Sequence, residues 1–206
     1  MAGKRLLLVR HADTGLRGVY LGRRDVPLAE AGVAQLPGLA EAVRRFAPDR
    51  CVMSPLLRAR QTGEFLGSAL GIAAVEDDRL QEVDFGDWDG LDFAAIADRD
   101  PELVRRWAEY GDDFRFPGGE GLVDFRQRVA AAAVDFCAGA GRTVLAVSHG
   151  GVIRTMLCHL LGIDCRNYLM FNVRPASLAV IDVADGYGVL QAFNVGGEEE
   201  RWRKSS

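Results

Sequence analysis

Apolar runs of strand length alternate with amphipathic stretches of helical length along most of the chain. Residues 6–9 form a continuous apolar run, which predicts a strand buried on both faces, as in a parallel sheet. Residues 30–46 carry apolar side chains at helical spacing, and Pro48 ends this predicted helix. Residues 51–53 predict a second strand. Ser54 as N-cap and Pro55 at the first helical position then predict a helix over residues 56–70.

The middle of the chain departs from this alternation. Residues 72–75 predict a weaker third strand, and residues 76–119 are rich in Asp, with one helical stretch near residues 102–110. This segment is too long for a simple loop and predicts an insertion that acts as a lid. The later elements are regular, with expected helices at 125–138 and 152–161 and expected strands at 143–147, 177–183 and 189–193. The tail from about residue 196 is expected to be flexible.

Strands that alternate with helices predict an α/β fold. We expect a three-layer α/β/α sandwich with a mainly parallel central sheet and helices on both faces. The length of 206 residues fits a single domain. Ligands of such sheets bind beyond the carboxyl ends of the strands, so residues that directly follow predicted strands are the first candidates for function.

Composition and charge exclude several classes of protein. The chain has 25 Lys and Arg against 29 Asp and Glu, and 49% of its residues are hydrophobic, which is typical of a soluble globular protein. A net charge of −4 argues against non-specific binding to nucleic acid or to an anionic membrane. No apolar run reaches the length of a membrane span, and we expect a cytoplasmic protein. The four cysteines match no zinc or redox motif, so we expect reduced thiols. The oligomeric state stays open, with a homodimer as one candidate.

Two of the three histidines follow predicted strands. Arg10 and His11 end the first strand, and His149 precedes a glycine pair that opens a helix. Arg58 lies in the first turn of the helix at residues 56–70, where backbone amides and the helix dipole favour an anion. Because parallel strands end at one edge of the sheet, these imidazoles, guanidiniums and helix starts are predicted to meet. Such a set suits a tetrahedral dianion such as a phosphoryl group, without a metal.

A neutral imidazole can attack phosphorus, and neighbouring arginines neutralise the phosphoryl oxygens. The leaving alkoxide then needs a proton. Glu82 lies between apolar residues, an environment that desolvates a carboxyl and suits a general acid. Asp84, Asp87 and Asp89 lie nearby and compete with Glu82 for this role.

Four blocks of the sequence resemble the histidine phosphatase superfamily, also called phosphoglycerate-mutase-like. The blocks are LVRHADT at 8–14, SPLLRARQT at 54–62, LQEVDFGDWDG at 80–90 and VSHGG at 147–151. They occur in the order of the family and together span most of the chain. The resemblance implies a phosphohistidine intermediate on His11, phosphate binding by Arg10, Arg58 and His149, and Glu82 as proton donor. It implies neither a metal nor another cofactor.

Further similarities point to the alpha-ribazole phosphatase branch of this superfamily. Residues 18–28, 117–129 and 171–194 are similar to that branch, and the Trp- and Asn-rich stretch of phosphoglycerate mutases is absent after the predicted nucleophile. The resemblance therefore implies a phosphomonoester hydrolase that acts on a small phosphorylated metabolite, with alpha-ribazole 5′-phosphate as a candidate. The alternatives are a phosphoglycerate mutase, a sugar-phosphate phosphatase and a non-catalytic module that recognises phosphorylated partners.

The chain departs from the family pattern at a few positions. Ala12 and Asp13 replace the usual Gly-Glu pair, and Ala12 fits there if its φ is negative. Arg17 replaces a common asparagine, and it either adds charge near the phosphate or points to solvent. Arg23 and Arg24 either contact a second anionic group of the substrate or form an exposed pair.

Other conspicuous side chains favour structural roles. Phe85, Trp88 and Phe93 are expected in the core of the insertion rather than against substrate. His159 lies within a predicted helix without a motif around it, which predicts a packing or surface position.

Overall fold

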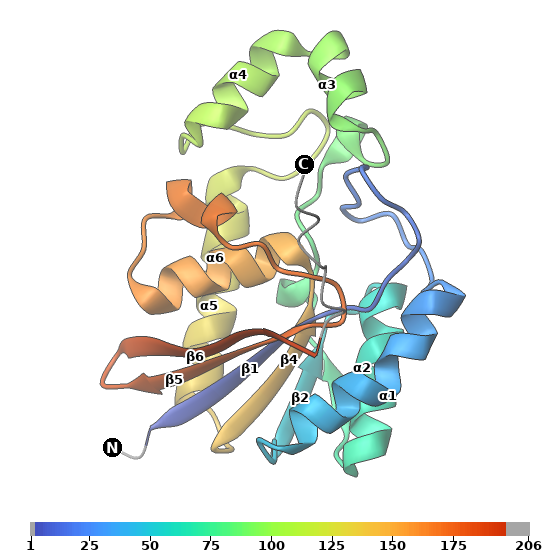
Figure 1. Cartoon of the computed structure of the whole chain (residues 1–206). Coiled ribbons are helices and arrows are strands. Elements are labelled where there is room, and N and C mark those ends of the chain that lie inside the picture. The colour runs from blue at the N-terminus through green and yellow to red at the C-terminus, as the bar shows by residue number, and fades with distance from the viewer. Residues whose placement is uncertain (1–2, 197–206) are drawn as a thin grey trace, which may run out of the picture.

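The computed structural model describes residues 3–196, so the predicted flexible tail lies outside the described residues except for Gly196. Its centre is a six-stranded sheet with the strand order β3-β2-β4-β1-β5-β6 (Figure 1). The strands are β1 (Lys4–Arg10), β2 (Arg50–Met53), β3 (Ala74–Glu76), β4 (Thr143–Ser148), β5 (Leu178–Ala184) and β6 (Tyr187–Val195). The first four are parallel to one another, whereas β5 is antiparallel to β1 and β6 is antiparallel to β5. The predicted mainly parallel α/β sheet is confirmed.

Helices cover both faces of this sheet (Figure 1). They are α1 (Glu30–Arg44), α2 (Leu57–Leu70), α3 (Phe93–Arg99), α4 (Pro101–Glu109), α5 (Leu122–Ala138) and α6 (Gly150–Leu161). Alternate side chains of β1 serve the two faces: Leu7 and Val9 pack with α1 and α2, whereas Leu6 and Leu8 pack with α5 and α6. The apolar run is therefore buried on both faces, as predicted. Within residues 3–196, no helix is both long and apolar enough to span a membrane.

The carboxyl ends of β1, β2 and β4 lie side by side. Arg10 of β1 is paired with Ser148 of β4. The pairing continues one residue beyond the strands, because the amide of His11 donates to Ser148 O (2.9 Å) and the amide of Ser54 donates to Val147 O (2.9 Å). This register brings His11, Ser54 and His149, which are far apart in the sequence, to one edge of the sheet.

The insertion between β3 and α5 contains two short 3₁₀ helices, η1 (Asp78–Leu80) and η2 (Gly86–Trp88), followed by α3 and α4. Figure 1 shows α3 and α4 above the sheet and its flanking helices. Trp88 is buried at its centre, where its indole N–H donates to Asp100 Oδ2 (2.7 Å). The predicted helix near residues 102–110 is α4, whereas α3 was not predicted. Phe85 and Trp88 are buried as expected, but the expectation for Phe93 is wrong, because its side chain is exposed.

The start of α2 also differs from the prediction. The helix begins at Leu57 with Leu56 as its N-cap residue, so neither Ser54 nor Pro55 has the predicted position. The amide of Leu57 donates instead to Asp25 Oδ1 (2.6 Å), a carboxylate from the loop that follows β1. Ser54 Oγ accepts the Leu56 amide (3.3 Å), and its hydroxyl turns toward the sheet edge. The predicted cap is therefore a residue of the candidate site.

Candidate active site

The imidazole rings of His11 and His149 lie next to each other, with ring centroids 5.1 Å apart. Both side chains are buried. They follow the neighbouring parallel strands β1 and β4, so the strand register fixes their separation. The prediction that two strand ends deliver two imidazoles to one place is confirmed.

The hydrogen bonds of His11 select one tautomer of its ring. Nδ1 lies 2.8 Å from the carbonyl oxygen of Ala12, which can only accept, so Nδ1 carries the proton. Arg58 Nε donates to Nε2 (3.3 Å), which therefore presents a lone pair. Burial, together with the charges of Arg10 and Arg58, lowers the pKa of His11 well below its usual value. His11 is thus a neutral imidazole with its proton on Nδ1 and its lone pair on Nε2.

Arg58 is fully buried, and backbone carbonyls hold its guanidinium in place. Nη1 donates to Arg24 O (2.9 Å) and Nη2 donates to Gly22 O (2.8 Å), both in the loop that follows β1. Thr62 ties this helix to the same loop, because its Oγ1 accepts the Ala12 amide (3.2 Å) and donates to Arg58 O (2.8 Å). No carboxylate pairs with Arg58 within the described chain, so the positive charge beside His11 Nε2 remains available to an anion.

His149 is held by Ser54. Its Nε2 lies 2.8 Å from Ser54 Oγ, and the buried Ser54 hydroxyl has no other acceptor among the described residues, so its proton points to Nε2. The ring proton of His149 then resides on Nδ1. This nitrogen is buried and has no hydrogen-bond partner among residues 3–196. Burial and the charge of Arg58 lower the pKa of His149 well below its usual value, so this ring is also neutral.

Arg10 provides a second buried donor without a partner. Its Nη1 donates to Val173 O (2.7 Å), whereas its Nε has no acceptor anywhere in the described part of the chain. Burial lowers the pKa of Arg10 to about 10, so it still carries its charge at neutral pH. Buried donors are almost always satisfied in folded proteins. The unmatched Nε of Arg10 and Nδ1 of His149 therefore indicate the place of a ligand with several acceptor oxygens.

Glu82 approaches the same place from the insertion. Its Oε2 accepts the amide of Gly151 (2.9 Å) at the start of α6, and its Oε1 accepts the amide of Val83 (3.1 Å). A Cβ at position 151 would lie only 2.5 Å from Oε1, so only glycine permits this contact. Arg128 of α5 fixes the backbone around Glu82, because its guanidinium donates to the carbonyl oxygens of residues 79, 81 and 82. Arg128 also forms a two-point ion pair with Glu120.

Three of the five predicted residues, Arg10, His11 and Glu82, line a cavity of about 760 Å³. Arg58 and His149 do not line the cavity but contact His11, so the structure brings all five together. The expectation that the start of α2 faces the anion is wrong, since the Leu57 amide is bonded to Asp25 and only Arg58 reaches the site. The start of α6 does reach it, because Gly150 and Gly151 line the cavity.

The structure also settles the departures from the family pattern. The backbone at Ala12 has no positive φ, so alanine fits there. Arg17 is exposed, lines the cavity and pairs with Asp13 Oδ2 (2.9 Å), so the two residues that depart from the family pattern contact each other. Arg23 and Arg24 are exposed and do not line the cavity.

Sequence reasoning missed three positioning residues, Ser54, Thr62 and Arg128. Ser54 and Thr62 lie within the block at 54–62 and Arg128 lies within the similar stretch at 117–129, but each acts through a contact with a segment far away in the chain, so the sequence did not reveal its role. Within residues 3–196, no three His, Cys, Asp or Glu side chains gather as metal ligands do, and all four cysteines are free thiols.

Comparison with known proteins identifies the family of this chain. The family model of the histidine phosphatase superfamily (branch 1) matches residues 6–196. The chain is a member of this superfamily. This histidine phosphatase is 32% identical to phosphoserine phosphatase 1 of Hydrogenobacter thermophilus over 194 aligned residues. The alignment covers 93% of this chain and 92% of the relative. The chain is 29% identical over 197 residues to the adenosylcobalamin/alpha-ribazole phosphatase of Salmonella typhimurium, with 92% and 96% covered.

Solved structures agree with this assignment. The alpha-ribazole phosphatase from Shigella flexneri superposes with a TM-score of 0.83 at 26% identity, over 94% of this chain and 97% of that one. The mycobacterial glucosyl-3-phosphoglycerate phosphatase gives a TM-score of 0.81 at 28% identity, with 93% and 99% covered. A bifunctional protein of Mycobacterium tuberculosis is 38% identical over 187 residues, and the match spans only 50% of that protein. The family and its phosphatase relatives identify the chain as a phosphoric monoester hydrolase, and the resemblance predicted from the sequence is confirmed.

Proposed function

We propose that this histidine phosphatase hydrolyses a small phosphorylated metabolite through a phosphohistidine on His11, without a metal. The observation that carries this proposal is the environment of His11 Nε2. Its lone pair accepts a hydrogen bond from Arg58 Nε, which a phosphoryl oxygen takes over when the substrate binds, and the unmatched donors on Arg10 and His149 belong to the same cluster. A phosphoryl group bound there has its oxygens on these donors and its phosphorus at the nucleophile.

In the first step, His11 Nε2 forms a bond to phosphorus while the bond between phosphorus and the leaving oxygen breaks. The protonated carboxyl of Glu82 gives its proton to that oxygen, and the alcohol departs. Arg10, Arg58 and His149 stabilise the negative charge on the three remaining oxygens. The proton of His11 stays on Nδ1 and is donated to the Ala12 carbonyl oxygen. This hydrogen bond stabilises the positive charge that the ring acquires.

In the second step, water replaces the alcohol. The Glu82 carboxylate takes a proton from water while the oxygen attacks phosphorus and the bond to Nε2 breaks. Phosphate leaves, and both His11 and Glu82 return to their starting protonation states. The cavity of about 760 Å³ supports this order of events because it leaves room for water beside the phosphoenzyme. A mutase has to keep the phosphoenzyme dry, so hydrolysis is the better match.

The relatives supply candidates for the substrate. Alpha-ribazole 5′-phosphate and phosphoserine follow from the names of two relatives that align with more than nine-tenths of the chain. In this proposal residues 1–206 act as one phosphatase domain, with residues 76–119 as the insertion that contributes Glu82. The protein is proposed to work in the cytoplasm, alone or as a homodimer.

The test is phosphate release from 4-nitrophenyl phosphate by the purified protein, with and without a metal chelator. We expect turnover that the chelator does not change and that His11→Asn reduces by several orders of magnitude. A parallel assay follows phosphoglycerate isomerisation. Isomerisation without phosphate release would establish the mutase alternative. Tight binding of phosphate without any turnover would establish the binding module.

A further inference from the structure

The cavity extends well beyond the catalytic cluster. Its volume of about 760 Å³ lies in the range of roughly 300–1,000 Å³ that is typical of pockets for drug-sized ligands. Arg10, His11 and Glu82 line the part where the phosphoryl group binds. The remaining lining comes from the loop after β1, from the insertion and from the 3₁₀ helix η3 (Cys165–Met170). An ester with a small alcohol would leave most of this space to water.

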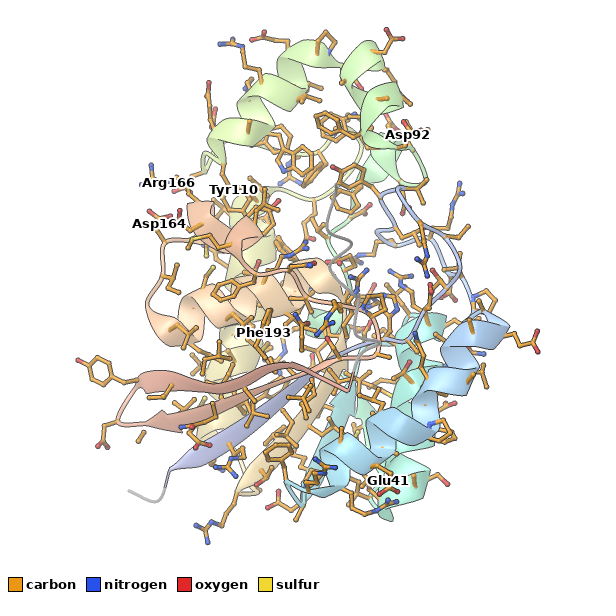
Figure 2. All side chains as sticks on the ribbon, viewed as in Figure 1. Glu41, Asp92, Tyr110, Asp164, Arg166 and Phe193 are labelled. Carbon is orange, nitrogen blue, oxygen red and sulfur yellow. The ribbon has the colours of Figure 1, made fainter. Side chains whose placement is uncertain are left out.

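The walls of this remaining space are aromatic. Tyr20 of the loop packs edge to face against Trp107 of α4, with ring centroids 5.5 Å apart. Tyr168 of η3 stacks on Tyr110 at the end of α4, with ring centroids 4.7 Å apart. Figure 2 shows Tyr110 and Arg166 where the end of α4 meets η3. All these side chains line the cavity, so three separate segments contribute flat apolar surface to it.

Exposed apolar residues lie at the rim of the cavity, beside the exposed cations Arg17 and Arg166. Leu16, Phe93 and Leu169 have exposed fractions of 49%, 53% and 68%, and each comes from a different segment. Single exposed apolar residues are common, but their convergence on one cavity is typical of a ligand-binding surface. Two of the cations on this wall are already paired, Arg17 with Asp13 and Arg166 with Asp164. Arg154 Nε donates to Phe171 O (2.8 Å), which leaves its Nη groups as donors for a polar atom of the substrate.

We infer that the leaving group of the substrate is bulky, planar and apolar, and that Tyr20, Trp107 and Tyr168 bind it beneath the rim formed by Leu16, Phe93 and Leu169. The inference rests on the proposed hydrolysis at His11 and adds the substrate class, which argues against phosphoserine because its alcohol is small and charged. Because a large apolar leaving group buries more of its surface in the cavity, kcat/KM should be higher for a large ester than for a small ester with the same leaving-group chemistry.

The test uses three phosphomonoesters of primary alcohols, namely ethyl, 2-phenylethyl and 2-(1-naphthyl)ethyl phosphate. Their leaving alkoxides are of similar basicity, so the main difference is the apolar group. We expect kcat/KM to rise with size, by about tenfold or more from the ethyl to the naphthyl ester. Equal efficiency for all three, or a preference for the ethyl ester, would overturn the inference and leave the proposed hydrolysis standing. Release of phosphate from none of them would overturn both.

The rim residues offer a matched pair of variants. Leu169 lines the cavity, whereas its neighbour Met170 is even more exposed, at 76%, and does not line it. We expect Leu169→Ser to lower kcat/KM for the naphthyl ester about fivefold through KM, with little effect on the ethyl ester. Phe93→Ser should act in the same direction, and Met170→Ser should change neither ester. All three positions are exposed, so the variants keep the fold. Unchanged ester preference in both Leu169→Ser and Phe93→Ser would overturn the inference.

Discussion

The hydroxyl of Ser54 lies 2.8 Å from Nε2 of His149, and both side chains are buried. Ser54 follows β2 and His149 follows β4, so this contact joins the ends of two neighbouring strands. It determines which nitrogen of His149 carries the proton. With Nε2 accepting from Ser54, Nδ1 is the unmatched donor that we propose binds a phosphoryl oxygen.

We expect Ser54→Ala to reduce kcat/KM about tenfold to a hundredfold, because the proton of His149 is no longer confined to Nδ1. Ser54→Thr retains a hydroxyl and should restore most of the activity. Ser68→Ala, on the exposed side of α2, is the matched control. Steady-state kinetics across a pH series measure the effect. Wild-type activity in Ser54→Ala, with an unchanged pH profile, would show that this contact only supports the fold.

The contact between Gly151 and Glu82 gives a test of the proton donor. In Gly151→Ala, the new methyl group would meet Glu82 Oε1 at 2.5 Å and displace the carboxyl. We expect hydrolysis of alkyl phosphates to fall about a hundredfold, because an alkoxide needs the proton of a general acid. Hydrolysis of 4-nitrophenyl phosphate should fall much less, since that leaving group departs without a proton.

Gly38→Ala in α1 is the control for this substitution, because nothing lies within 4 Å of the added methyl group there. It should leave both esters unaffected. An equal loss for alkyl and 4-nitrophenyl esters in Gly151→Ala would argue against Glu82 as the proton donor.

The two buried histidines make stability depend on pH. Burial and the neighbouring arginines lower the pKa of His11 and of His149 below 6.5, so the unfolded chain takes up protons that the folded protein does not. Their contribution is fully present above about pH 6.5 and is lost as the pH falls below it. Each histidine should add up to about 1.4 kcal/mol per pH unit to the slope of the unfolding free energy.

Urea denaturation between about pH 4.5 and pH 8 measures this slope, in a range where most carboxylates stay ionised. His11→Asn and His149→Gln should each flatten it, whereas His159→Asn, an exposed position on α6, should not. A slope that stays the same in both buried-site variants would mean that these imidazoles are not held neutral.

The sequence predicted the elements that have a strong local pattern. The apolar run at residues 6–9 needs no distant partner to be identified as a buried strand, and the blocks around His11, Arg58, Glu82 and His149 are local. The segment of α3 is short and buries only Ile96, so it has no helical stripe, although Asp92 caps it by accepting the Ala95 amide (2.8 Å). The carboxyl of Asp92 is a local signal that could have located this helix.

The features that escaped prediction depend on contacts between distant segments. Ser54 has the local pattern of a helix cap, but the carboxylate of Asp25 takes the Leu57 amide and leaves Ser54 to His149. Arg128 acts on Glu82 through backbone carbonyls of another segment. Phe93 is exposed and lines the cavity instead of packing in the core of the insertion, and no sequence pattern distinguishes these two positions.

The most direct test of the account is to trap the phosphoenzyme. The reaction is quenched rapidly during turnover of an ester labelled in its phosphoryl group, and peptide mapping then identifies the labelled residue. The ³¹P NMR spectrum identifies which ring nitrogen carries the phosphoryl group. We predict an acid-labile, base-stable phosphoryl group on Nε2 of His11, since Nδ1 donates to the Ala12 carbonyl. His11→Asn should show no label. A label on any other residue, or hydrolysis that proceeds without any labelled intermediate, would contradict the account.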